Sequence, residues 1–299
     1  MAEGLSLEAT ARLFELEPET VAQWLALAAN HFEALSAYLS QNLELEQVQL
    51  DDLYVKLRLV QSSDRNSVRW LYNAIDPVSK FWLTFRLGER GLGTVQSLVH
   101  QLVQQLAPGV IPLFLSDGER SFETSLLSHY GQWEQVADSR GQSRRRWLGL
   151  AEFAYVRVVK RRLRRRLVSV KHRLVRGQLK PIKAKLAQHG WSINTAFIER
   201  FNLTLRQHVP ALRRRVLALA RSEAGLQHQR TLVQLYYNLC LPYQGLPQAG
   251  REERVRSQAQ TPAMALGLTD QLWRLEELLL IPVPPWPPAS LACSSLARS

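Results

Sequence analysis

The chain has 299 residues, of which 46% are hydrophobic and 21% are charged, a composition that supports a packed core and excludes a collagen-like or wholly disordered protein. Two cysteines, Cys240 and Cys293, are too few for a disulfide framework or a four-thiolate zinc site. The N-terminus lacks the basic start of a secretory signal, and no stretch of about 18 apolar residues occurs. We therefore expect a protein that is neither secreted nor membrane-spanning.

Charge is distributed unevenly along the chain, although the net total of +12 already points to an anionic partner. The segment from Arg140 to Lys185 contains 17 Lys and Arg residues and a single acid, Glu152. Residues 1–52 lie at the other extreme, with ten acids and one base, Arg12. The basic character of the protein therefore resides in one segment.

The first 42 residues predict two helices joined by a short turn. Pro18 suits the first turn of the second helix, in which Val21, Trp24 and Leu25 recur at helical spacing and should be buried. This is the outline of a small all-α, helix-turn-helix-like unit. Its second helix carries no basic residue, so we expect it to bind DNA weakly.

Strands and helices alternate in the next part of the chain. The run VQLDDLYVKLRLV is followed by two aromatic and β-branched runs that flank a turn at Asp76-Pro77, which predicts three antiparallel strands between residues 48 and 87. The segment TVQSLVHQLVQQLA has helical spacing and ends at Pro108. The apolar run VIPLFLSDG is typical of a buried strand whose carboxyl end opens on a site, and a helix should follow it to about His129.

Pattern alone does not decide the structure of the basic segment. Its Val and Leu residues fit both helical spacing and strand alternation, and we favour strands because Val and Tyr dominate its flanks and Gly177 ends the run. From Asn194, a candidate N-cap, a long amphipathic helix is predicted, with a kink or break at Pro210. Helices should also cover about 226–240 and 269–280, and the last 15 or so residues should be disordered or polyproline-like.

This order of elements predicts an α/β protein with a ribonuclease-H-like mixed sheet and flanking helices, preceded by the small all-α unit. We assign residues 1–42 to the helix-turn-helix-like unit and 43–241 to the sheet domain, with a basic insertion at about 140–190. Residues 242–299 form a Pro-rich tail. In such an order, acids on the first strand, after the fourth strand and on a late helix converge. The candidates are Asp51, Asp117 and Glu199.

Three segments resemble the DDE transposases of small bacterial insertion sequences, the family typified by insertion sequence one. They are WLYNAIDP, LFLSDGERSFE and NTAFIERFNLTLRQHVPALRRR, and the resemblance extends from about Val48 to Leu280. The third segment is the most specific because it matches the family's helix that carries the third acid. The matching residues are Ile198, Glu199, Arg200, Asn202, Leu205, Arg206 and Gln207.

The resemblance implies a transposase that cleaves DNA at the ends of an insertion element and joins the strands to target DNA. Asp51, Asp117 and Glu199 would then be catalytic ligands of two Mg²⁺ ions, with Mn²⁺ as an alternative, because hard cations prefer carboxylate oxygens. Relatives usually have Asp-Glu at the position of Asp51 and Asp52, with the first residue catalytic, so we choose Asp51. The implied partner is double-stranded DNA, bound by a homo-oligomer in the bacterial cytosol with the nucleoid.

Each acid also has a purely structural interpretation. Glu199 could form a surface ion pair with Arg200, and Asp117 could serve a turn. Asp76 is better interpreted as a turn residue. Asp52 competes with Asp51 for the first position, since neighbours in a strand face opposite ways. The seven histidines have no ligand spacing, and we assign them no metal.

The basic run that begins at residue 160 has three interpretations: a solvated loop, a surface for anionic lipid, or a contact with DNA phosphates. On a nuclease-like scaffold we favour DNA. The predicted DNA-binding residues are Lys160, Arg161, Arg162, Arg164, Arg165, Arg166, Asn202 and Arg206. The last two share a helical stripe with Glu199, so support of the site is their alternative role.

The chain departs from the family in two places. No cysteines precede the helix-turn-helix-like unit, so the zinc ribbon of many relatives is missing, and Tyr243 stands where relatives commonly have a histidine. The alternative function is therefore a catalytically inactive, transposase-derived DNA-binding protein. Retention of all three acids favours the enzyme.

Overall fold

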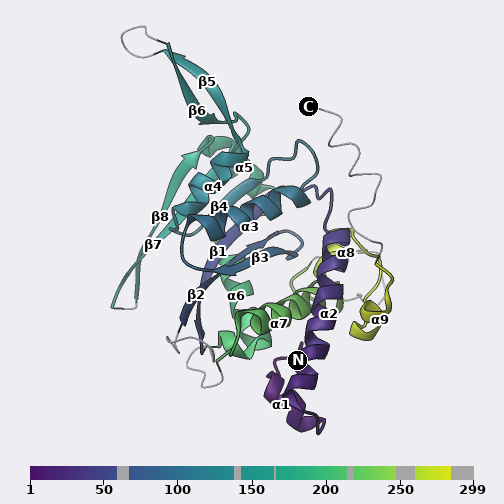
Figure 1. Ribbon diagram of the computed structural model, residues 1–299. Helices are drawn as coiled ribbons and strands as arrows, with labels where there is room; N and C mark the ends of the chain where they lie inside the picture. Colours follow the sequence, from purple (N-terminus) through teal and green to yellow (C-terminus); the bar gives the residue numbers. More distant parts are fainter. Residues whose placement is uncertain (59–66, 138–142, 165, 214–218, 247–259, 284–299) are drawn as a thin grey trace. The chain divides into compact units, whose positions relative to one another are not determined.

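The computed structural model describes residues 1–58, 67–137, 143–164, 166–213, 219–246 and 260–283 (Figure 1). The chain forms two compact units. The sheet unit comprises residues 42–55 and 68–204, and the helical unit comprises residues 1–41, 56–67 and 205–299. Residues 242–246 and 260–283 of the predicted tail are described, whereas its last 15 or so residues, expected to be disordered or polyproline-like, lie outside the described residues.

The sheet unit carries the strands and the helices that pack on them. Its elements are β1 (Gln47–Leu57), β2 (Ser67–Ile75), β3 (Trp82–Gly88), α3 (Leu92–Gln105), β4 (Leu113–Ser116), α4 (Ser121–His129), β5 (Gly131–Ala137), β6 (Ser143–Gly149), β7 (Tyr155–Leu163), β8 (Arg166–Arg176), α5 (Leu179–Ala187) and α6 (Ala196–His208). The last residues of β1 and α6 belong to the helical unit.

Among the described residues, six strands form a mixed sheet in the order β3-β2-β1-β4-β7-β8 (Figure 1). β2 and β3 are antiparallel, β4 lies parallel to both β1 and β7, and β8 is antiparallel to β7. β5 and β6 form a separate two-stranded antiparallel sheet. The α/β class is therefore confirmed, and the strand order is compatible with a ribonuclease-H-like sheet.

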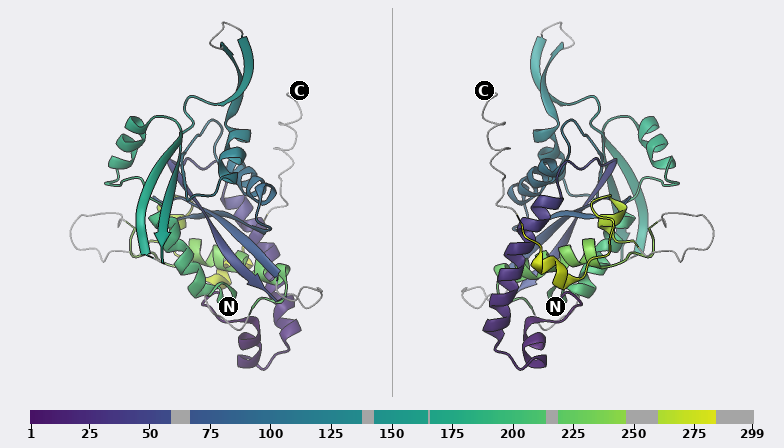
Figure 2. Two further views of the ribbon diagram at one scale, coloured as in Figure 1. Left: turned by 90° about the vertical axis from the view of Figure 1, so that its left-hand side faces the viewer. Right: turned by 90° about the vertical axis from the view of Figure 1, so that its right-hand side faces the viewer.

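Helices cover both faces of the main sheet (Figure 2). On one face lie α3 and α4, where Tyr72 of β2 packs edge-on against Phe122 of α4. On the other face lies α5, whose Ile182 and Leu186 join a buried cluster with Leu115 of β4. Both faces of β4 are thus covered, which explains why its sequence is a continuous apolar run.

The basic segment from Arg140 to Lys185 folds largely as strands, as predicted from its sequence. It divides among β6 of the small sheet, β7 and β8 of the main sheet, and α5, which the sequence pattern did not indicate. Because β7 pairs directly with β4, this part of the segment belongs to the central sheet. Gly177 follows β8 with a φ of 84°, a left-handed conformation that glycine adopts without a steric penalty.

The helical unit contains α1 (Leu7–Leu13), α2 (Pro18–Leu39), a 3₁₀ turn (Pro210–Leu212), α7 (Glu223–Leu235), a π-helical turn (Tyr236–Cys240), α8 (Pro262–Ala265) and α9 (Leu275–Leu280). The predicted break at Pro210 is confirmed, because α6 ends just before it. Within this unit α2 packs against α7. No helix in the described ranges is long and apolar enough to cross a membrane.

One predicted core residue of α2 is wrong. Val21 and Leu25 are buried, but 57% of Trp24 is exposed. The buried side of α2 continues through Ala29 and Phe32, so it follows a narrow stripe of i, i+4 and i, i+3 steps. Viewed down the helix axis, Leu25, Ala29 and Phe32 lie on one side of Val21. Trp24 lies on the opposite side of Val21 and therefore outside the buried stripe.

Candidate functional site

The parallel pairing of β1 with β4 brings two of the predicted acids together. Leu50 lies opposite Ser116 in the register. Asp51 and Asp117, which follow these two residues, therefore meet where β4 ends. Carboxylate oxygens of Asp51, Asp52 and Asp117 all lie within 4.8 Å of one another. We call these three residues the acid cluster.

Asp52 belongs to the acid cluster although it faces the opposite side of β1 from Asp51. Its neighbour Asp117 follows the last residue of β4, and a side chain beyond a strand end is not confined to one face of the sheet. Within the described part of the chain, no hydrogen-bond donor reaches the buried Oδ2 of Asp52. From the sequence, Asp52 was the competitor of Asp51, and Asp51 was preferred because relatives usually have Asp-Glu here with the first residue catalytic; the structure places both acids in the cluster.

Burial raises the pKa of all three carboxyl groups. The pKa of Asp51 lies well above its ordinary value, first because the group is buried and then because Asp117 and Asp52 repel its charge. Burial, followed by the charge of Asp117, raises the pKa of Asp52 to about 7. The pKa of Asp117 is also raised by burial. The cluster is therefore a concentration of negative charge that a cation would stabilise.

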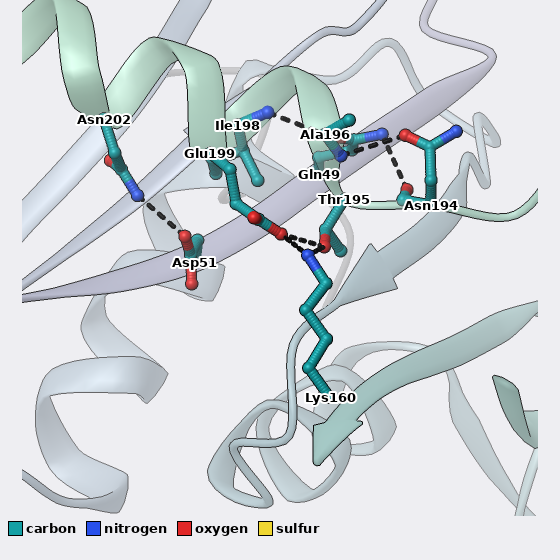
Figure 3. Close-up of polar contacts among 9 residues, drawn as sticks. All are labelled: Gln49, Asp51, Lys160, Asn194, Thr195, Ala196, Ile198, Glu199 and Asn202. Carbon is teal, nitrogen blue, oxygen red and sulfur yellow. Dashed lines mark hydrogen bonds and ion pairs between the residues drawn. The ribbon is translucent and has the colours of Figure 1, made fainter. Parts of the chain in front are cut away.

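Gln49 fixes the start of α6 on the face of β1 that also carries Asp51 (Figure 3). Its Oε1 accepts a hydrogen bond from the backbone N–H of Ile198 at 3.1 Å, and its Nε2 donates to the carbonyl of Asn194 at 3.0 Å. The Asn194 side chain accepts the N–H of Ala196 at 2.9 Å, one residue ahead of the N-cap position, which is Thr195 because α6 begins at Ala196. The first turn of α6 is thereby attached to β1.

Asn202 lies further along α6 and supports Asp51 directly (Figure 3). Its Nδ2 donates to Asp51 Oδ2 at 2.7 Å, and its Oδ1 accepts from Nδ2 of Asn73 on β2 at 3.2 Å. Only 4% of Asn202 is exposed. The predicted DNA contact of Asn202 does not fit this burial, because its face of α6 packs on the sheet, and the alternative role in supporting the site fits.

Glu199 lies one turn before Asn202, and its side chain extends toward Lys160 of β7 (Figure 3). Its Oε1 forms an ion pair with the Lys160 ammonium and accepts a hydrogen bond from Thr195 Oγ1 at 2.7 Å. The Glu199 side chain is 41% exposed. Among the described residues, the group of acids close enough to share a metal ion does not include Glu199.

The remaining predicted DNA-binding residues lie mainly on the hairpin of β7 and β8, which we call the basic hairpin. Arg161, Arg164 and Arg166 are exposed. Arg162 belongs to β7, whereas Arg165 lies outside the described residues. Arg206 of α6 is half-buried.

Two further side chains at the edge of the acid cluster had no signal in the sequence. Arg90 lies 3.3 Å from Glu119, and its charge opposes the rise in the pKa of Asp52 and of Asp117. The Arg90 guanidinium also lies 4.4 Å from the centre of the Trp70 ring. By contrast, Asp76 serves the predicted turn, since it accepts the backbone N–H groups that follow it.

Comparisons with known proteins identify no family for this chain. No family model matches the chain, and no curated protein matches it in sequence. Among solved structures, the chain is similar to one from the crystal structure of the Mos1 strand transfer complex, with 12% identity and a TM-score of 0.21. The similarity covers 42% of this chain and half the length of the other. A likeness this weak decides neither the fold nor the function.

Proposed function

We propose that the protein is a metal-dependent enzyme that cleaves and joins DNA strands, as its resemblance to insertion-sequence transposases implies. The observation that carries the proposal is the acid cluster, in which three carboxylates lie within 4.8 Å at adjacent strands of a mixed sheet. The basic hairpin in the same unit suits a polyanionic substrate. The proposed partner is double-stranded DNA, at both element ends and target, bound by a homo-oligomer in the cytosol.

The acid cluster fits a divalent cation of the Mg²⁺ type. Hard cations prefer carboxylate oxygens, and Asp52 offers a buried oxygen that no donor within the described residues satisfies. Asp51, Asp52 and Asp117 would hold the metal, with Glu199 as a further ligand from α6. When bound, the metal supplies charge stabilisation at the attacking and leaving oxygens of a phosphodiester.

The residues around the cluster would orient its carboxylates and hold the substrate. Asn202, itself bonded to Asn73, fixes the orientation of Asp51. The exposed Arg161, Arg164 and Arg166 would contact DNA phosphates, and such contacts position a duplex without reading its sequence.

The direct test is nicking of DNA that carries the repeats flanking the protein's own gene. We expect strand cleavage in Mg²⁺ or Mn²⁺, loss of cleavage with a chelator, and recovery when the metal is restored. The variant Glu134→Gln, on the separate β5–β6 sheet, should cleave normally. Absence of metal-dependent nicking on these ends by folded protein would contradict the proposal.

The second candidate is a DNA-binding protein without catalytic activity. It is favoured by the position of Glu199, which pairs with Lys160 and lies outside the acid cluster. Under this alternative the duplex would still bind, but Mn²⁺ titrated onto the protein would not bind at the acid cluster. Metal titration and duplex binding measured on one preparation therefore separate the two functions.

A further inference from the structure

Glu199 and Lys160, which the sequence assigns to two different ligands, are bound to each other (Figure 3). The Lys160 ammonium contacts Glu199 Oε1 and lies 3.3 Å from Thr195 Oγ1. Thr195 is 1% exposed and donates to the same Glu199 oxygen at 2.7 Å. The pair is therefore held at a fixed place between β7 and the first turn of α6.

Metal binding by Glu199 and phosphate binding by Lys160 would each compete with this ion pair. A carboxylate oxygen that neutralises an ammonium group is a weaker ligand for a metal ion, since both cations compete for the same negative charge. An ammonium group that neutralises a carboxylate likewise contributes less to binding a phosphate. Asn202 already contacts Asp51, so α6 lies against the acid cluster, and Glu199 precedes Asn202 by three residues on the same helix.

We propose that the Lys160–Glu199 pair couples metal binding to DNA binding, a role that rests on the proposed function. A metal ion at the acid cluster draws Glu199 from the pair and releases Lys160 toward phosphate. A phosphate that draws Lys160 in turn releases Glu199 toward the metal. Such coupling is reciprocal, so each ligand strengthens binding of the other by the same factor. Lys160 is then a positioning residue that disfavours metal binding until DNA is present.

The first test measures Mn²⁺ affinity without DNA, by calorimetric titration or electron paramagnetic resonance. Lys160→Met should tighten Mn²⁺ binding by about fivefold or more, and Lys160→Gln repeats the test where the Met variant does not fold. Asp51→Asn should abolish binding in both backgrounds. Binding that requires Asp51 but does not tighten without Lys160 overturns the coupling alone. Absence of Mn²⁺ binding that depends on Asp51 overturns the proposed function.

The second test measures duplex binding without metal as a function of salt. Glu199→Gln should tighten binding and increase the magnitude of the log K against log salt slope by about 0.9, because Lys160 is then able to neutralise one further phosphate. The double variant Lys160→Met/Glu199→Gln should not show that increase. An increase retained in the double variant would overturn the coupling.

Glu123→Gln provides the matched control. Glu123 lies 3.6 Å from Arg157 on the same strand as Lys160, and Arg157 is 3% exposed. This variant removes an equal negative charge, yet the released cation is buried and cannot reach a phosphate. We expect Glu123→Gln to leave the salt slope unchanged. Equal increases in Glu123→Gln and Glu199→Gln would mean that net charge alone is responsible and would refute the coupling.

Discussion

The acid cluster and the basic hairpin carry opposite charges in the same unit, and they differ in how far those charges are exposed to solvent. Only 8% of Asp51 is exposed, and all three acids of the cluster have raised pKa values. The bases Arg161, Arg164 and Arg166 are exposed to solvent. A buried charge depends on a few fixed partners, whereas exposed charges act through their sum and are screened by salt. Single changes in the cluster should therefore have large effects, and those in the hairpin small, additive ones.

The largest effect is expected from the acids that meet between β1 and β4. Asp51→Asn and Asp117→Asn should each reduce metal-dependent cleavage by about 10³-fold or more, since metal stabilisation of the transition state is worth several kcal/mol. Asp52→Asn should cost less, because Asp52 is half-buried whereas Asp51 is buried, and its replacement leaves the pair of Asp51 and Asp117 in place. Nicking rates of the three variants, measured under single-turnover conditions, test this ranking of their effects. Cleavage at a near wild-type rate by Asp117→Asn would contradict it.

The pH dependence of stability tests the burial of the cluster directly. Asp52 has a pKa of about 7 in the folded protein against 3.8 for the ordinary group, so the folded state binds its proton more tightly than the unfolded state. The contribution of Asp52 to stability is therefore present at low pH and lost as pH rises from about 4 through 7, by at most about 4 kcal/mol.

Urea unfolding of the metal-depleted protein at pH 5 and pH 8 measures this contribution. The Asp52→Asn variant should lose less stability than the wild type over that range, and added Mn²⁺ should restore wild-type stability at pH 8. Equal pH dependence in the two proteins would show that Asp52 ionises as an ordinary surface acid.

Removal of the Asn202 amide should have the next largest effect. Asn202→Ala leaves Asp51 and Asn73 without their partner in a buried site, which costs about 1–3 kcal/mol. Leu203→Ala is the control on the same helix, since 47% of Leu203 is exposed, and it should change the unfolding free energy by less than about 0.5 kcal/mol. Similar losses in both variants would argue against a specific role for Asn202.

The approach of Asp51 to Asp117 was predictable from the sequence because it depends on strand order. A continuous apolar run that ends in an acid indicates a buried strand with its carboxyl end at a site, and β4 has that character. The helix face of Ile198, Phe201 and Leu205 was also predictable, and all three are buried. Regular periodicity and burial determine these features, and both leave a signal in the local sequence.

The partners of individual charges were not predictable. The contact between Lys160 and Glu199 joins residues 39 positions apart, and it depends on the placement of α6 over β7. Asp52 joins the acid cluster only because Asp117 lies beyond a strand end. The strands β5 and β6 also left no clear pattern, since both faces of that small sheet carry polar side chains, and Trp133 and Trp147, which pair across one face, are exposed.

The basic hairpin should contribute a smaller, salt-dependent effect. Replacing Arg161, Arg164 and Arg166 with Gln should reduce the magnitude of the salt slope of duplex binding by about 0.9 for each phosphate that the hairpin no longer neutralises. Arg274→Gln, an exposed base of the helical unit, should leave the slope nearly unchanged. Fluorescence anisotropy between low and moderate salt measures both. A triple variant with the wild-type slope would place DNA binding elsewhere.

The smallest expected effect separates charge from backbone geometry at the tip of the basic hairpin. Arg164 has a φ of 48°, the left-handed region that Asn tolerates and β-branched residues avoid. Arg164→Asn and Arg164→Val both remove one charge, but only the Val variant strains the turn, by about 1–3 kcal/mol. If charge alone matters, the salt slope of both variants should fall in magnitude by about 0.9. A fall confined to Arg164→Val would mean that the conformation of the hairpin, rather than its charge, determines how it meets DNA.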